Sequence, residues 1–163
     1  MSIAATLVAA LQVEADKTKK ILSRIPEASL GWKPHEKSMS LGRLGMHIAE
    51  LPDWITRCVD SECFDFAIGV PERIVADTHA QIMEKFEDSL EKAVAALQHT
   101  TDVMFAMHWQ LKRGEQIIQD MPRTDVISNG LHHIIHHCGQ LSVYLRMLDV
   151  PLPNMFGPTA DER

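Results

Sequence analysis

Apolar residues recur every three to four positions in four long segments of this chain, which is the spacing of one face of an α-helix. The first segment, residues 2–25, begins at the capping residue Ser2 and ends before Pro26. Its stripe consists of Leu7, Leu11, Ala15, Thr18, Leu22 and Ile25. The other three predicted helices span residues 40 to 58 or 62, 78–99 and 124–149. The pattern therefore predicts an all-α fold, a four-helix bundle whose helices bury their stripes against one another.

Two interruptions modify this prediction. Pro52 lies inside the second predicted helix, where it removes a backbone hydrogen bond and should kink the helix. Residues 100–123 lack the helical spacing, and 112–115 have the composition of a turn. We therefore expect a long loop with a small hairpin between the third and fourth helices. The tail that begins at Pro151 is expected to be extended, and its residues 156–162 are expected to fold over a neighbouring helix or a second subunit.

Composition and charge exclude several classes of function. The chain has 163 residues, enough for a single domain (residues 1–163) with a hydrophobic core, and a formal net charge of −6. Because no run is rich in lysine and arginine, nucleic acid and anionic membranes are not expected partners. There is also no apolar run of about eighteen residues, so no membrane span is expected. The three cysteines form no CxxC motif, which favours a reduced, cytoplasmic protein.

Four of the nine histidines gather in one short stretch of the fourth predicted helix. His132 and His136 form one pair and His133 and His137 another, each with the i, i+4 spacing that places two imidazoles on one helix face. At about 100° per residue, His133 and His137 border the apolar face, whereas the other pair points away from it. His133 and His137 are therefore the better candidates for holding a metal ion. Taken alone, the pair is equally well explained as polar residues on a solvated helix or as histidines hydrogen-bonded to backbone.

His47, on the second predicted helix, also lies at the border of its apolar stripe. Metal sites in helical bundles are built from inward side chains of facing helices, so His47 is expected to meet the pair on the fourth helix. No general base can be assigned, because Glu50 and Asp53 fall off the stripe and are better explained as a solvated face. Gln140 lies along the same face of its helix as His133 and is a candidate to orient a ligand or a water.

Five segments of the chain form a distinctive combination: 32–41 (WKPHEKSMSL), 44–50 (LGMHIAE), 121–123 (MPR), 133–146 (HIIHHCGQLSVYLR) and 156–162 (FGPTADE). Together they resemble the DinB-like superfamily of metal-binding four-helix bundles, named for a DNA-damage-inducible protein of bacteria. The resemblance implies an up-down-down-up arrangement of helices and a metal triad with one histidine from the second helix and two from the fourth. At the matching positions these are His47, His133 and His137. Cys138 and Thr159 depart from the family pattern, which usually has Arg and Ser or a similar residue there, but neither departure removes a ligand.

Three neutral imidazoles leave at least one coordination position of a divalent ion open, which is the arrangement of catalytic metal sites. Zinc or nickel suits such donors, whereas magnesium and calcium prefer oxygen. Some members of the family look like thiol-dependent transferases, and others resemble a thiol-dependent isomerase of maleylpyruvate. We therefore expect a metal-dependent enzyme, thiol S-transferase-like or hydrolytic. It would act on a small molecule, with a low-molecular-weight thiol as partner, and form a homodimer.

Two other hypotheses stay open at this point. The first is a non-catalytic, stress-associated protein that binds a metal or a small ligand, and the weaker second one has no metal at all. An accessible pocket beside the histidines would favour the enzyme. A site covered by Trp32, Trp54 or the tail would favour the non-catalytic protein.

Overall fold

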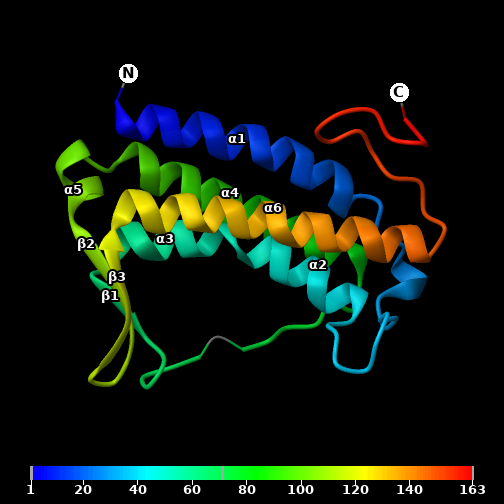
Figure 1. Ribbon diagram of the computed structural model, residues 1–163, viewed down its shortest axis with the longest axis horizontal. Helices are drawn as coiled ribbons and strands as arrows, with labels where there is room; N and C mark the ends of the chain where they lie inside the picture. The colour runs from blue at the N-terminus through cyan, green and yellow to red at the C-terminus, as the bar shows by residue number, and fades with distance from the viewer. Residues whose placement is uncertain (1, 71, 163) are drawn as a thin grey trace.

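The computed structural model describes residues 2–70 and 72–162, and long helices make up most of it (Figure 1). Helix α1 (Ile3–Leu22) contacts α4 (His79–Gln98) and α6 (Arg123–Met147). The consecutive helices α2 (Leu41–Glu50) and α3 (Pro52–Asp60) contact the same two partners. The four helical segments expected from the apolar pattern are thus present, with the second divided in two.

Polar side chains define where three of these helices begin. Ser2 and Ser40 each accept a hydrogen bond of 3.2 Å from the backbone N–H three residues later, at the starts of α1 and α2. Thr78 forms a reciprocal capping box with Gln81 at the start of α4. A short 3-10 helix, η1 (Glu27–Ser29), follows α1 and turns the chain toward α2.

Pro52 divides the second helical segment. Because proline has no backbone N–H, it cannot donate to the carbonyl of Ile48, which instead accepts a 3.3 Å bond from Leu51. Helix α2 therefore ends at Glu50 and α3 begins at Pro52, so the predicted interruption is confirmed. Leu51 keeps helical dihedral angles (φ −62°, ψ −36°), which confines the break to a single turn.

A three-stranded mixed sheet lies at one end of the helices, beside the short helix α5 (Asp102–Ala106) (Figure 1). Strands β2 (His108–Arg113) and β3 (Gln116–Pro122) form an antiparallel hairpin, and β1 (Cys63–Asp65) pairs with β2 in parallel. The prediction of an all-α four-helix bundle is therefore wrong, although the expected hairpin is present. Strand β1 has only three residues, too few to show the alternation that identifies a strand, and it forms because β2 offers it an edge.

Arg123, the first residue of α6, joins the sheet to the helices. Its side chain is buried, with the residue 2% exposed. The guanidinium donates four hydrogen bonds of 2.9 to 3.3 Å to the backbone carbonyls of Cys58, Ser61, Met107 and His108. The first two carbonyls lie at the C-terminal end of α3, where the helix dipole is negative, and the other two lie at the start of β2.

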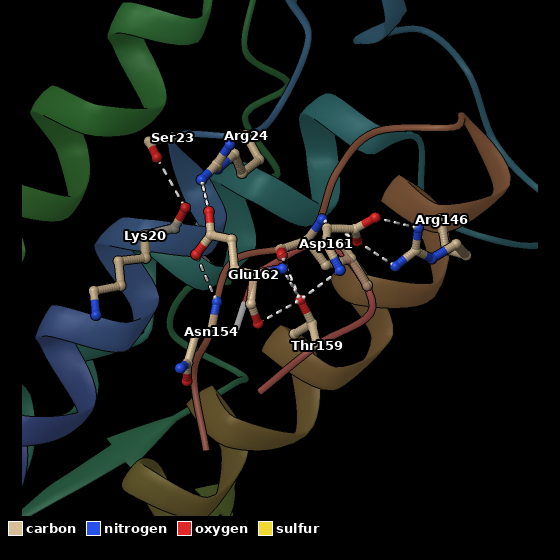
Figure 2. A network of polar contacts seen from close by, with 9 residues as sticks. Lys20, Ser23, Arg24, Arg146, Asn154, Thr159, Asp161 and Glu162 are labelled. Atoms are coloured by element: carbon tan, nitrogen blue, oxygen red, sulfur yellow. Dashed lines mark hydrogen bonds and ion pairs between the residues drawn. The ribbon is translucent and has the colours of Figure 1, made fainter. Parts of the chain in front are cut away.

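The C-terminal tail is held at the other end of the helices by polar contacts (Figures 1 and 2). Glu162 forms an ion pair with Arg24, just after α1, and Asp161 forms one of 2.5 Å with Arg146 near the end of α6. The hydroxyl of Thr159 accepts hydrogen bonds from the backbone N–H groups of Asp161 (3.1 Å) and Glu162 (2.9 Å). The tail thus folds over helices of its own chain, which is one of the two arrangements expected from the sequence.

No helix within residues 2–70 and 72–162 is long and apolar enough to cross a membrane. The cysteines Cys58, Cys63 and Cys138 are all free thiols. Burial raises the pKa of Cys58 to about 12 and the pKa of Cys138 to about 11. These two thiols are therefore protonated near neutral pH and are poor nucleophiles.

Candidate metal centre

Three histidines that are distant in sequence meet where α2 packs against α6. His47 lies on α2, and His133 and His137 lie one turn apart on α6. The apolar stripes of both helices are buried in one core cluster, and the histidines border these stripes. His137 is buried (8% exposed), His47 is half-buried and His133 is exposed, so the site is open to solvent on the side of His133.

The Nε2 atoms of the three rings converge. Nε2 of His137 lies 2.9 Å from Nε2 of His133 and 3.1 Å from Nε2 of His47. Each of the three histidines offers one ring nitrogen as a ligand atom, and these three nitrogens lie within 4.8 Å of one another. The three residues expected to meet therefore do meet, and their binding of a metal stays a prediction.

Gln140 fixes the orientation of His137. Its side-chain Oε1 lies 2.7 Å from Nδ1 of His137, and its amide nitrogen lies 3.0 Å from Nε2 of His136. Because an amide oxygen only accepts hydrogen bonds, Nδ1 of His137 carries the proton and Nε2 keeps its lone pair toward the other two rings. Metal-binding histidines are commonly oriented by such a bond at their second ring nitrogen. Of the two roles expected for Gln140, this contact supports the orientation of a ligand residue.

The local environment favours the neutral form of all three imidazoles. Burial is the main cause that lowers the pKa of His47 to about 4, and the charges of His137 and Arg43 act in the same direction. Burial also lowers the pKa of His133 and of His137, although the hydrogen bond with Gln140 opposes the shift at His137. A neutral imidazole presents the lone pair that a metal ion requires, so the donors suit a divalent cation near pH 7.

Hydrogen bonding inside the triad cannot satisfy all three rings. The single Nε2 lone pair of His137 faces two other Nε2 atoms, and it has room for one good donor. A cation shared by three lone pairs resolves this competition. Two nitrogens that each lie about 2.1 Å from one ion are separated by about 3.0 to 3.4 Å. The distances of 2.9 and 3.1 Å around His137 are close to that range, so the residues present fit the group.

The other candidates from this stretch of α6 lie outside the triad. His132 and His136 are exposed, as the helical wheel predicts. Cys138 is buried and its sulfur lies 3.6 Å from the hydroxyl of Thr18 on α1. Cys138 therefore faces α1, in agreement with the prediction that it is not a ligand.

A pocket of about 230 Å³ borders His47. It lies between α2, α3, α4 and the connection after β1, and its other lining residues are Glu50, Leu51, Asp53, Trp54, Arg57, Glu72, Ile74 and Lys85. Glu50 and Asp53, which were expected to lie on a solvated helix face, thus line this pocket. Both are already paired, Glu50 with Arg43 at 2.9 Å and Asp53 with Lys85 at 2.7 Å.

Three charged residues of this pocket, Arg57, Glu72 and Lys85, were not identified from the sequence. Arg43, which pairs with Glu50, was not identified either, although it lies at position i−4 from His47, where a helical wheel centred on that histidine finds it. Arg57 and Lys85 come from helices that the pattern describes only as amphipathic. Part of the lining comes from the irregular connection after β1, for which no sequence signal exists. Only the packing of these elements brings the residues together.

Comparisons with known proteins agree with the fold. The profile of the DinB family matches residues 1–162. The uncharacterized protein YrdA of Bacillus subtilis (strain 168) is 24% identical over 155 residues, which cover 93% of this chain and 86% of that protein. A solved DinB-like protein from Bacillus cereus ATCC 10987 superposes with a TM-score of 0.76 at 19% identity, covering 95% of this chain and 98% of its own. A solved DinB-like protein of Bacillus subtilis, YjoA, superposes with a TM-score of 0.71 at 20% identity. The match covers 97% of this chain and 99% of YjoA.

Proposed function

This chain belongs to the DinB family, and on that premise we propose that it is a metal-dependent enzyme whose zinc or nickel ion is held by His47, His133 and His137. The proposed reaction is thiol S-transferase-like, with a small-molecule substrate and a low-molecular-weight thiol as the second reactant. Hydrolysis is the variant in which water replaces the thiol. When bound, the ion supplies Lewis-acid chemistry that favours the deprotonated form of a thiol or water near neutral pH.

One observation carries this proposal. Three neutral imidazole nitrogens from two helices converge on one point, and hydrogen bonds among them leave at least one ring unsatisfied. Structural metal sites usually have four protein ligands, whereas a set of three leaves a position for a reactant. The exposure of His133 leaves that position within reach of solvent and of small molecules.

The residues around the triad have separate roles in this proposal. Gln140 keeps the proton on Nδ1 of His137 and so directs Nε2 toward the ion. Arg43 holds Glu50 through an ion pair and donates a 3.1 Å hydrogen bond to the carbonyl of Ile74, which builds one wall of the pocket. The pocket leaves room for the substrate beside His47.

The pocket also bears on the alternative of a non-catalytic metal- or ligand-binding protein. That alternative predicts a site closed to reactants. In this part of the molecule His133 is exposed and His47 borders an open pocket, with Trp54 forming part of its wall. These features support the enzyme over the alternative.

Metal content tests the proposal directly. Untagged protein, purified without added metal, is analysed by mass spectrometry together with the double variant His133→Ala/His137→Ala. We expect about one zinc or nickel ion per wild-type chain and a loss of that ion from the variant. Thiol-transfer and hydrolysis assays on the loaded protein then distinguish the two reactions.

A matched control separates the triad from histidines in general. The double variant His99→Ala/His132→Ala likewise removes two imidazoles. Both of these lie at exposed positions outside the triad, so this variant should keep the ion. If wild-type protein contains no metal and takes up none on titration with zinc or nickel, the proposed enzyme loses its chemical basis. If both double variants lose the metal equally, His133 and His137 are not its specific ligands.

A further inference from the structure

The pocket beside His47 contains an arginine whose charge is not used inside the protein. Arg57 lies on α3 and is half-buried. Its guanidinium carbon lies 4.7 Å from the ring centroid of Phe64 and 5.6 Å from that of Trp54. Within residues 2–70 and 72–162, the guanidinium takes part in no ion pair and donates no hydrogen bond. Arg57 thus has an ordered environment but no anionic partner.

Two carboxylates of the pocket that contains Arg57 are bound by other cations. Asp53 lies four residues before Arg57 on the same helix, which is the usual spacing for a surface ion pair. Asp53 is bound instead by Lys85 of α4 at 2.7 Å. Glu50, the other acid on this wall, is bound by Arg43 at 2.9 Å. The packing of the pocket therefore pairs its other cations and leaves Arg57 available.

Stacking on aromatic rings prepares an arginine for recognition of an anion. The guanidinium carbon of Arg57 lies over the two rings, and its five N–H donors form no hydrogen bond within the described residues. Because Phe64 and Trp54 restrict the side chain, little conformational entropy is lost when the edge binds a carboxylate with two parallel hydrogen bonds. Partial burial also strengthens such charge-assisted bonds relative to those in water.

Arg57 also borders a second, more apolar depression. This depression has a volume of about 500 Å³ and includes Phe64, Ile68 and Val70 in its lining. Ile68 is 87% exposed and Val70 is 64% exposed, so their side chains offer apolar surface to a bound molecule. Arg57 thus stands between the pocket at His47 and an apolar surface.

We propose that Arg57 binds a carboxylate of the substrate, which is a small organic acid with an apolar body. This inference rests on the proposed function, because the part of the substrate that reacts would lie in the pocket beside His47 while its carboxylate is bound by Arg57. Arg57 holds the acid group, and the apolar body packs on Trp54 or in the depression at Ile68 and Val70. Arg57 is then a residue that determines specificity and takes no part in the bond changes.

The charges of the pocket favour a carboxylate over a phosphate. Its lining contains three carboxylates, of which Glu50 and Asp53 are paired with Arg43 and Lys85. The third, Glu72, repels a dianionic phosphate about twice as strongly as a monoanionic carboxylate. The planar edge of one guanidinium also matches the two oxygens of one carboxylate.

Binding measurements on matched probes test the proposal. Phenylbutanoate, its neutral amide phenylbutanamide and phenylpropyl phosphate are titrated calorimetrically into the purified chain, with and without one equivalent of zinc. We expect the wild-type chain to bind the carboxylate about tenfold or more tightly than the amide. Arg57→Gln should abolish this preference, and Arg57→Lys should keep part of it because it retains the charge and loses the planar fork. The difference between wild type and Arg57→Gln isolates the role of Arg57 from any binding of the probe to zinc.

Arg113 provides the matched control. It is also stacked on an aromatic ring, 5.9 Å from the centroid of Phe66, and it lines neither depression. Arg113→Gln should leave the preference for the carboxylate unchanged, and thermal melting should show all variants folded. The proposal is overturned if the wild-type chain shows no preference for the carboxylate over the amide at millimolar concentrations. It is also overturned if Arg57→Gln keeps this preference or if Arg113→Gln loses it to the same extent. Tighter binding of the phosphate than of the carboxylate through Arg57 overturns it as well. The proposed function fails separately if the wild-type chain takes up no zinc. That result does not depend on Arg57, because Arg57→Gln should take up as much zinc as the wild-type chain.

Discussion

Helix α6 carries two polar centres that use their hydrogen-bonding groups in opposite ways. At its first residue, all three nitrogens of the buried Arg123 donate to backbone carbonyls of α3 and the sheet. Near its middle, Nε2 of His137 faces the Nε2 atoms of two other histidines, and these contacts cannot satisfy every ring. The Arg123 centre is complete within the protein, whereas the histidine centre leaves hydrogen-bonding capacity that a further group could use.

Depth of burial therefore does not identify the functional residues of this protein. Arg123 is 2% exposed and His137 is 8% exposed, so the structural charge is the more deeply buried of the two. What separates them is whether their polar atoms are satisfied. Four variants or conditions test this difference, in order of decreasing expected effect.

Removal of the Arg123 side chain should have the largest effect on stability. Arg123→Met leaves four backbone carbonyls without their donor, so we expect the free energy of unfolding to fall by about 3 to 5 kcal/mol. Urea denaturation followed by circular dichroism measures this change. The exposed Arg113→Met serves as the control, with an expected change below about 0.5 kcal/mol. A loss below about 1 kcal/mol for Arg123→Met would contradict the structural role.

Loss of one triad imidazole should affect metal binding far more than folding. His137→Gln keeps a polar side chain but removes the central ligand, so zinc affinity should fall by about a hundredfold or more, equivalent to about 2.7 kcal/mol. The free energy of unfolding of the metal-free protein should change by less than about 1 kcal/mol. Competition with a fluorescent zinc chelator measures the affinity. Equal losses in affinity and stability would place His137 in the same structural category as Arg123.

Gln140 should have a smaller, selective effect on the metal. Gln140→Leu removes the acceptor for Nδ1–H of His137, and zinc affinity should fall about tenfold because the ring is no longer oriented. Gln140→Glu restores an acceptor of the same length and should recover most of the affinity. An unchanged affinity in Gln140→Leu would show that packing alone orients His137.

The smallest expected effect is a dependence of metal-free stability on pH. Burial lowers the pKa of His47 to about 4, and it also lowers the pKa of His133 and of His137. The unfolded chain, with histidine pKa values near 6.5, then binds more protons than the folded chain between about pH 6.5 and pH 4. Stability should therefore fall as the pH decreases through this window, which urea midpoints at pH 7, 6 and 5 can show.

His47→Gln provides the control for this dependence. It removes the group with the largest of the three shifts, so its stability should decline less between pH 7 and pH 5 than that of wild type. The paired carboxylates, such as Asp161, have lowered pKa values and lose their contribution only at lower pH. A wild-type stability that is constant or rises on acidification contradicts the environment assigned to the triad.

Local periodicity predicted much of this molecule. The apolar stripes and the cap Ser2 indicated the helices, and Pro52 indicated the break between α2 and α3. The same periodicity brought His47, His133 and His137 to the borders of facing stripes. These predictions succeeded because helix geometry depends on residues three and four apart, which a single sequence displays.

The sequence by itself determined which faces of the helices are buried and which histidines can meet. The tertiary structure alone decided the pairing of β1 with β2, the four carbonyls around Arg123 and the pocket that joins His47 to Arg57. These features depend on hydrogen bonds and contacts between segments distant in the chain, such as Cys63 with Gln110, and no local spacing encodes them. For the same reason, a charge such as that of Arg57 looks ordinary in the sequence, and only packing shows that Asp53 and Glu50 are already bound by other cations.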